Sequence, residues 1–147
     1  MFFSFILRFR FDILIPVMFS LNNSYQNLGI CNHMTFIDMD KKDILRIVEP
    51  IMDNCLNGSN EDNHSKHARD FTERMRKIVT PENLKMQLSQ EPRVFFTHRK
   101  FIYLFRRQSS IGVIWKQYTS KSNDELMNQA IFVERESKIL IDHCMIC

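Results

Sequence analysis

Three residue types that together can perform nucleophilic catalysis stand side by side near the end of the chain: Asp142, His143 and Cys144. A thiol becomes a nucleophile when an imidazole removes its proton, and a carboxylate can orient that imidazole. The surrounding sequence KILIDHCMIC reads as a strand, in which successive side chains point to opposite faces. We therefore expect His143 to share one face with Ile139 and Ile141. Asp142 and Cys144 are expected on the other face, which separates the base from the thiol.

Asp142 and His143 remain the candidate catalytic residues, because a polar group among apolar neighbours often has a shifted pKa. Two interpretations stay open. In one, either residue transfers a proton inside a pocket. In the other, which is the commoner arrangement, Asp142 is hydrogen-bonded to Lys116 or to an arginine of a neighbouring strand, and His143 is a core residue with a partner. Cys144 is expected to be a small buried hydrophobe.

The sequence gives little sign of a metal site, a cofactor or a disulfide framework. His64 and His67 are three apart on one helical face, whereas zinc pairs in helices are better four apart, and only Asp70 offers a third ligand. We expect no metal and no cofactor. Reduced thiols in the cytoplasm are expected for the four cysteines, which are Cys31, Cys55, Cys144 and Cys147.

Charge is mild overall but unevenly distributed. The net charge of the 147 residues is +3, which is too small to predict binding to nucleic acid. Residues 93–121 nevertheless hold seven basic side chains, no acidic one and several aromatic rings. This stretch either favours a small anionic ligand or, as is more usual, is a sheet with an aromatic core face and long cationic chains at its margins.

The first 33 residues differ from the rest. Their apolar run is interrupted by Arg8, Arg10 and Asp12, so it fits neither an export signal nor a spanning helix, which needs about 20 apolar residues. We expect residues 1–33 to be a non-globular hydrophobic leader and polar linker, or an upstream misread start, followed by one domain over residues 34–147. An interfacial anchor is the alternative, with membrane contact only if the leader is retained.

Apolar residues then recur at helical spacing in three segments. The first helix is expected to begin at Asp40, to bend at Pro50 and to end at Gly58. A second helix is expected over Ser59–Ile78, because acid and base pairs four apart support it. Thr80 precedes a proline and is expected to cap a third helix.

From residue 93 onward the apolar period changes from about 3.6 to 2. Strict alternation in KFIYLFRR would place Phe101, Tyr103 and Phe105 on one face, and IGVIWKQY puts Trp115 and Gln117 together. RQSS predicts a hairpin between these strands, and a second hairpin is expected between NQAIFVERE and KILIDHCMIC. Helices followed by an antiparallel meander indicate an α+β fold, with three N-terminal helices packed on one face of the sheet.

This order of elements resembles the nuclear-transport-factor-2-like superfamily and its SnoaL-like members. The resemblance covers residues 40–147 and rests on HARDFTERMRKIVTPENL leading to VFFTHRKFIYLFRR, IGVIWKQYTS and KILIDHC. It implies a cystatin-like α+β roll, in which a curved antiparallel sheet wraps round the helices as a cone with a pocket inside. The candidate pocket residues are then Trp115, Tyr103, Phe105 and Gln117. Members of the superfamily commonly dimerise through the outer face of the sheet.

Three functions stay open, two implied by the resemblance and one by the leader, and whether the chain is an enzyme stays open among them. The first is a domain that binds a small, perhaps anionic, ligand or another protein, as a homodimer. The second is a SnoaL-like lyase or isomerase in which Asp142 or His143 transfers a proton, as acidic residues and histidines do in ketosteroid isomerase and scytalone dehydratase. The third is an accessory protein that its leader attaches to a membrane surface.

Overall fold

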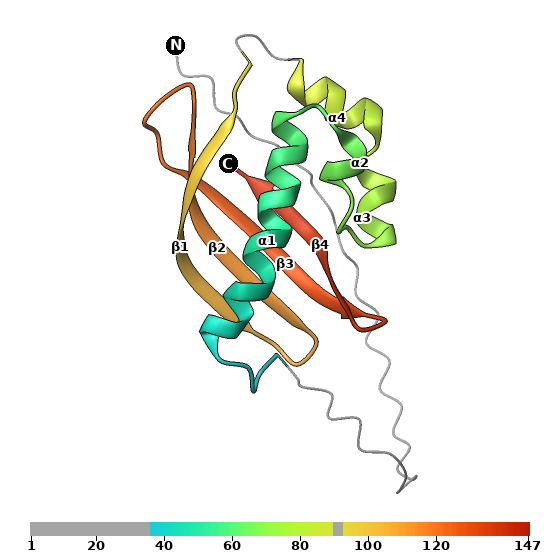
Figure 1. Cartoon of the computed structure of the whole chain (residues 1–147), viewed down its shortest axis with the longest axis vertical. Coiled ribbons are helices and arrows are strands. Elements are labelled where there is room, and N and C mark those ends of the chain that lie inside the picture. Colours follow the sequence, from blue (N-terminus) through green and yellow to red (C-terminus); the bar gives the residue numbers. More distant parts are fainter. Residues whose placement is uncertain (1–35, 90–92) are drawn as a thin grey trace, which may run out of the picture.

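A computed structural model describes residues 36–89 and 93–147, and its fold is α+β as the sequence predicts. The predicted leader over residues 1–33 and the domain boundary at residue 34 lie outside the described residues. The four strands pair as one antiparallel sheet in the order β1-β2-β3-β4 (Figure 1). The elements are α1 Lys41–Asn60, α2 His64–His67, α3 Glu73–Ile78, α4 Pro81–Leu88, β1 Phe96–Arg106, β2 Ser110–Thr119, β3 Leu126–Arg135 and β4 Lys138–Ile146.

The long helix α1 supplies the core contacts to the sheet. It begins after Asp40, as predicted, and continues through Pro50. Its apolar stripe is almost fully buried, with Ile44, Val48 and Met52 at 0% exposure. Figure 1 shows α1 crossing one side of the sheet diagonally, with the three shorter helices beside β4. The hydrophobic core therefore lies between α1 and the face of the sheet beneath it, which we call the inner face.

The predicted end of the first helix at Gly58 is wrong, because α1 continues to Asn60. Gly58 is buried against the chain at the end of α2, and a Cβ atom there would lie 2.3 Å from the backbone nitrogen of His67. The missing side chain thus allows two backbones to approach closely, which is a use of glycine that differs from a helix cap.

The single helix predicted over residues 59–78 is also wrong, because the chain forms α2 and α3 with an extended segment between them. That segment pairs with the edge of β4. The backbone N–H of Ile141 donates to the carbonyl of Asp70 at 2.7 Å, and the N–H of Thr72 donates to the carbonyl of Ile141 at 2.9 Å. The Thr72 side chain then caps α3. Pairing across the fold has overridden a strong local helix pattern.

Three predicted turns and caps are confirmed. The Thr80 side chain accepts a backbone hydrogen bond in the first turn of α4. The β1–β2 hairpin is closed by the N–H of Arg107, which donates to the carbonyl of Ser110 at 2.9 Å. Glu136 and Ser137 form the β3–β4 turn with φ angles of 50° and 61°. Positive φ at both central residues is what a tight turn between right-twisted strands requires.

An irregularity in β1 changes which of its side chains share a face. The register between β1 and β2 shifts between Phe101 and Tyr103. Phe101 therefore pairs with buried Trp115 and lies on the inner face, whereas Tyr103 and Phe105 lie on the opposite, outer face. The predicted grouping of these three aromatic residues on one face is wrong, because a bulge inserts one extra residue into the alternation.

A second irregularity affects β4. The register of β3 and β4 shifts where Asp142 has no strand partner, so that Ile141 and Cys144 both lie on the inner face. His143 pairs with Ile131 on the outer face. The expected separation of His143 from Cys144 is confirmed, but the expected sharing of a face by Ile141 and His143 is wrong for the same reason as in β1.

Candidate interaction surface

The outer face of the sheet is apolar and open to solvent. In the described part of the chain no helix crosses it (Figure 1). Tyr103 is 56% exposed, Phe105 is 50% exposed and Met127 is 41% exposed. Other apolar side chains of this face are half-buried, except Val133, which is buried; they are Ile114, Ile131, Val133, Leu140 and Met145. Contiguous apolar surface of this kind is typical of interaction sites.

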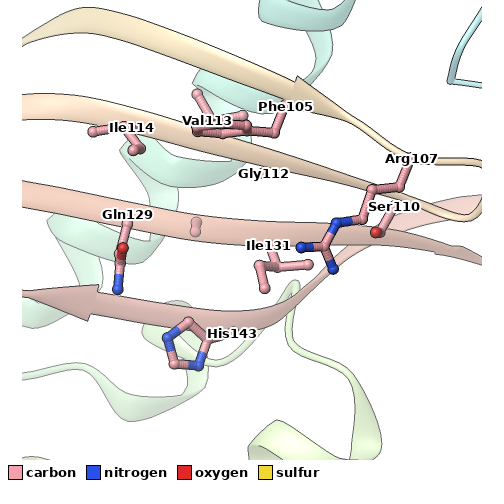
Figure 2. Close-up of a pocket in the computed structure, with 10 residues that line it drawn as sticks. Phe105, Arg107, Ser110, Gly112, Val113, Ile114, Gln129, Ile131 and His143 are labelled. Carbon is pink, nitrogen blue, oxygen red and sulfur yellow. The ribbon is translucent and has the colours of Figure 1, made fainter.

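A shallow hollow of about 250 Å³ lies on this face. Figure 2 shows Gln129, Ile131 and His143 projecting from β3 and β4 on the same side, with the guanidinium of Arg107 reaching over the strands. Gly112 lies opposite Phe105 in the sheet, and a Cβ atom at this glycine would lie 3.5 Å from the Cβ of Phe105. That is an ordinary contact, so the glycine is not required by packing.

Ion pairs on the outer face lie toward one end of the strands. Lys116 forms an ion pair with Glu125 at 2.7 Å, and the Tyr118 hydroxyl donates to the same carboxylate at 3.0 Å. Hydrogen bonds from Lys116 and Tyr118 lower the pKa of Glu125. In the middle of the face Gln129 and Ile131 are uncharged, and Arg107 and His143 lie beside them around the hollow. An apolar centre with a polar margin is the usual anatomy of a protein interface.

Each edge of the sheet is engaged at one point by another part of the chain. Residues 70–72 pair with the edge of β4 through Ile141. At the start of β1, the Asn60 side chain donates to the carbonyl of Phe96 at 2.7 Å and accepts from its N–H at 2.8 Å. The bulge in β1 interrupts the remainder of that edge. Such contacts and bulges make strand addition at these points less favourable.

The four predicted pocket residues do not meet around one cavity. Trp115 and Gln117 are 0% exposed and face α1, whereas Tyr103 and Phe105 are on the outer face. The Trp115 indole donates to a carboxylate oxygen of Glu49 at 2.7 Å. The interior position of Trp115 is therefore occupied by packing and by a hydrogen bond within the protein.

Sequence reasoning missed the polar cluster that surrounds this tryptophan. Arg99 forms ion pairs with Glu49 and with Asp53, the latter at 2.6 Å, and its guanidinium lies 5.5 Å from the Trp115 ring centre. Asn128 is buried beside it and donates to Gln117 at 3.2 Å. Glu49 and Asp53 are four residues apart on α1, and this spacing is the sequence signal for the cluster. The spacing alone does not identify Arg99 of β1 as the residue that both carboxylates bind.

Asp142 is held in an ion pair, with a partner that differs from the expected strand cation. Thr72 donates to one carboxylate oxygen at 2.8 Å, and Arg74 of α3 donates to the other at 3.0 Å. Burial alone would raise the pKa of Asp142, but the hydrogen bonds from Arg74 and Thr72 outweigh it and lower the pKa. A carboxylate with a lowered pKa is a weak base, so this geometry fastens α3 to β4 and does not favour proton abstraction.

Three of the histidines lie in different settings. His143 lines the hollow on the outer face. The Nδ1 atom of His67 lies 2.8 Å from the carbonyl of Cys55 and 2.9 Å from the hydroxyl of Ser59, and burial lowers the pKa of His67. His64 bonds through Nε2 to the carbonyl of Val79 at 2.7 Å. Within residues 36–89 and 93–147, no group of three metal-binding side chains comes together.

The basic stretch of the sequence does not form one free surface, because three of its members are already engaged. Arg99 and Lys116 are in ion pairs with acidic residues. Arg93 donates to the carbonyls of Ser59 and Asn60 at the end of α1, at 3.2 and 3.0 Å. Because these three basic side chains bind groups within the protein, the positive charge of residues 93–121 is not gathered on one open surface.

In the described part of the chain, none of the helices is both long and apolar enough to cross a membrane. Neither a scan against protein-family models nor a comparison with curated proteins gives a match to this chain.

Proposed function

We propose that the chain is a nuclear-transport-factor-2-like interaction domain whose outer face binds a second copy of itself. The order of helices before an antiparallel meander, with α1 across the inner face, supports the roll. The single observation that carries the interaction is the open apolar face spanning all four strands. Burial of that surface would be strongly favourable in water.

The size of the outer face suits a dimer. Four strands about 4.8 Å apart and roughly 30 Å long offer about 600 Å² before side-chain relief is added. Stable interfaces bury roughly 800 Å² on each partner, so nearly the whole face would be covered. Gln129 and Ile131 in the middle of the face are uncharged and can pack against a second copy, provided that the Arg107 guanidinium beside them turns toward solvent in the dimer.

The other functions expected from the sequence find less support. A small ligand inside the roll would need space beside Trp115 and Phe132, both of which are at 0% exposure. A lyase or isomerase would need a base, and Asp142 is bound by Arg74 and Thr72. His143 lies in an open hollow on the outer face, where contact with a partner is the simpler role.

Light scattering after size-exclusion chromatography tests the proposal. The full chain is expected to elute as a dimer at micromolar concentrations, and Ile131→Lys is expected to elute as a monomer, because it places a charge in the middle of the interface. Met86→Lys is the matched control, since Met86 is 68% exposed on α4 and does not belong to the outer face. A monomeric wild-type chain, or equal loss of dimer in both variants, would contradict the proposal.

Attachment by the leader is tested separately, because residues 1–33 lie outside the described residues. Flotation of the full chain with anionic vesicles is compared with that of a chain beginning at Met34. Retention of only the longer chain on the vesicles would support an anchored accessory protein. Equal behaviour would leave the expected cytoplasmic interaction domain.

A further inference from the structure

Two cysteines that are distant in the sequence meet between α1 and β4. Cys55 belongs to the buried stripe of α1 and is 2% exposed. Cys144 lies on the inner face, because the irregularity at Asp142 reverses the alternation of β4. Its partner across the sheet is Ala130, which is also buried on the inner face. Figure 1 shows the later half of α1 crossing the end of β4.

The two cysteines face one another across the contact between α1 and β4 and differ in burial. Cys144 is half-buried and packs against the core, whereas Cys55 is buried, so Cys144 is the more accessible of the two. Interaction with Cys144 and burial raise the pKa of Cys55, which keeps its thiol protonated in the reduced protein. This combines an accessible cysteine with a buried partner.

We propose that Cys55 and Cys144 form a reversible disulfide that ties α1 to β4 when the protein encounters a low-molecular-weight disulfide such as oxidised glutathione. The proposal is independent of the interaction through the outer face, because both thiols lie on the other side of the sheet. The redox state of Cys55 and Cys144 has no part in the proposed function.

The reaction proceeds by two thiol–disulfide exchanges. The thiolate of Cys144 attacks one sulfur of oxidised glutathione, whose sulfur–sulfur bond breaks, and one glutathione leaves as a thiolate. Cys55 then loses its proton and attacks the Cys144 sulfur of the mixed disulfide, which releases the second glutathione. In total the two protein thiols lose two electrons and two protons, and oxidised glutathione becomes two reduced glutathione molecules.

The second exchange is expected to be slow. His67 has its Nδ1 atom 3.5 Å from the Cys55 sulfur, but the same nitrogen lies 2.8 Å from the Cys55 carbonyl. A carbonyl oxygen only accepts hydrogen bonds, so Nδ1 carries the proton and cannot remove one from the thiol. Without a nearby base, and with its pKa raised, Cys55 reacts through a small thiolate fraction.

Peptide mapping tests the proposal on the folded full chain. The Cys147→Ser variant is treated with oxidised glutathione, its remaining thiols are alkylated, and it is digested with trypsin. Cleavage after Arg46, Lys66 and Lys138 yields peptides 47–66 and 139–147, each with one remaining cysteine in this variant. We expect these two peptides to be joined, and to separate when dithiothreitol is added.

The Cys144→Ser, Cys147→Ser double variant is the matched control. It should yield no joined peptide and no change in melting temperature with oxidised glutathione. The single variant is expected to gain about 10 °C in melting temperature on oxidation, because the bond closes a loop of about 90 residues in the unfolded chain. Cys55 left unpaired, Cys55 joined to Cys31, or a bond that forms only in denaturant would each overturn the proposal.

Discussion

Large apolar side chains occur on both faces of the sheet, but their surroundings differ. On the inner face Trp115, Phe132 and Ile141 are at 0% exposure beneath α1. On the outer face Tyr103 and Phe105 are about half exposed, and no helix in the described part of the chain covers them. The inner face is therefore completed by the chain itself, whereas the outer face keeps large aromatic side chains exposed at its surface.

The largest expected effect is on the free energy of unfolding, when one aromatic residue on each face is replaced by alanine. Phe132→Ala should lower the free energy of unfolding by about 3–5 kcal/mol, because it leaves a cavity in the core. Phe105→Ala should lower it by less than about 1 kcal/mol under monomeric conditions, since the ring is 50% exposed. Urea denaturation of both variants makes the measurement. Similar losses would mean that the outer face is covered in the monomer.

The two described glycines give a second contrast. Gly58→Ala should destabilise the fold by about 1–3 kcal/mol, because the new Cβ atom would clash with the backbone of His67. Gly112→Ala on the outer face should be neutral or slightly stabilising, since its Cβ atom meets only ordinary contacts. Thermal unfolding of both variants compares them. A tolerated Gly58→Ala would contradict the close approach of α1 to α2.

A pH dependence should arise on the α1 side of the molecule. Burial lowers the pKa of His67, so the unfolded chain, in which histidine has its usual pKa of about 6.5, binds the proton more readily. Stability should therefore be full above about pH 6.5 and fall as the pH drops toward the lower pKa of the folded state. Urea titrations between pH 7.5 and 5 should show this fall, which His67→Gln should reduce.

The matched control for this pH experiment is His98→Gln. His98 is exposed and stacks on Tyr118 with ring centres 4.3 Å apart, on the sheet and away from α2. Its replacement should leave the pH dependence intact. A dependence that survives His67→Gln unchanged would assign the effect to another group.

The smallest expected effect concerns the turn between β3 and β4. Ser137 has a φ of 61°, a conformation that glycine adopts without steric cost. Ser137→Gly should therefore raise the free energy of unfolding by about 0.5–1 kcal/mol and change neither face. Chemical denaturation measures the gain, and a loss of stability would show that the serine side chain supports the turn.

Local sequence patterns predicted much of the fold but not the details that decide the candidate site. The α+β order, the Thr80 cap and both hairpins follow from capping and turn residues. The irregularities at residues 101–103 and at Asp142 do not, because a bulge leaves no reliable trace in an alternating pattern. The bulge in β1 places Tyr103 and Phe105 on the face opposite Trp115, so the predicted pocket residues do not come together. The irregularity at Asp142 places Cys144 on the same face as Ile141, toward Cys55.

Local sequence patterns also did not identify contacts between residues that are distant in the sequence. Asp142 was expected to bind a strand cation, yet the partner is Arg74, because the pairing of residues 70–72 with β4 brings α3 beside that strand. The break in the predicted second helix has the same origin. Long-range strand pairing therefore explains both the misplaced helix and the misassigned ion pair.

The most direct test of the proposed interface is photo-crosslinking from the outer face. The photoreactive amino acid p-benzoylphenylalanine replaces Tyr103, which is 56% exposed, and in a control chain it replaces Met86 on α4. We predict a covalent dimer from position 103, with the crosslink on a residue of the partner's outer face, and none from position 86. Equal crosslinking from both positions, or none from position 103 at concentrations where the wild-type chain is dimeric, would contradict the account.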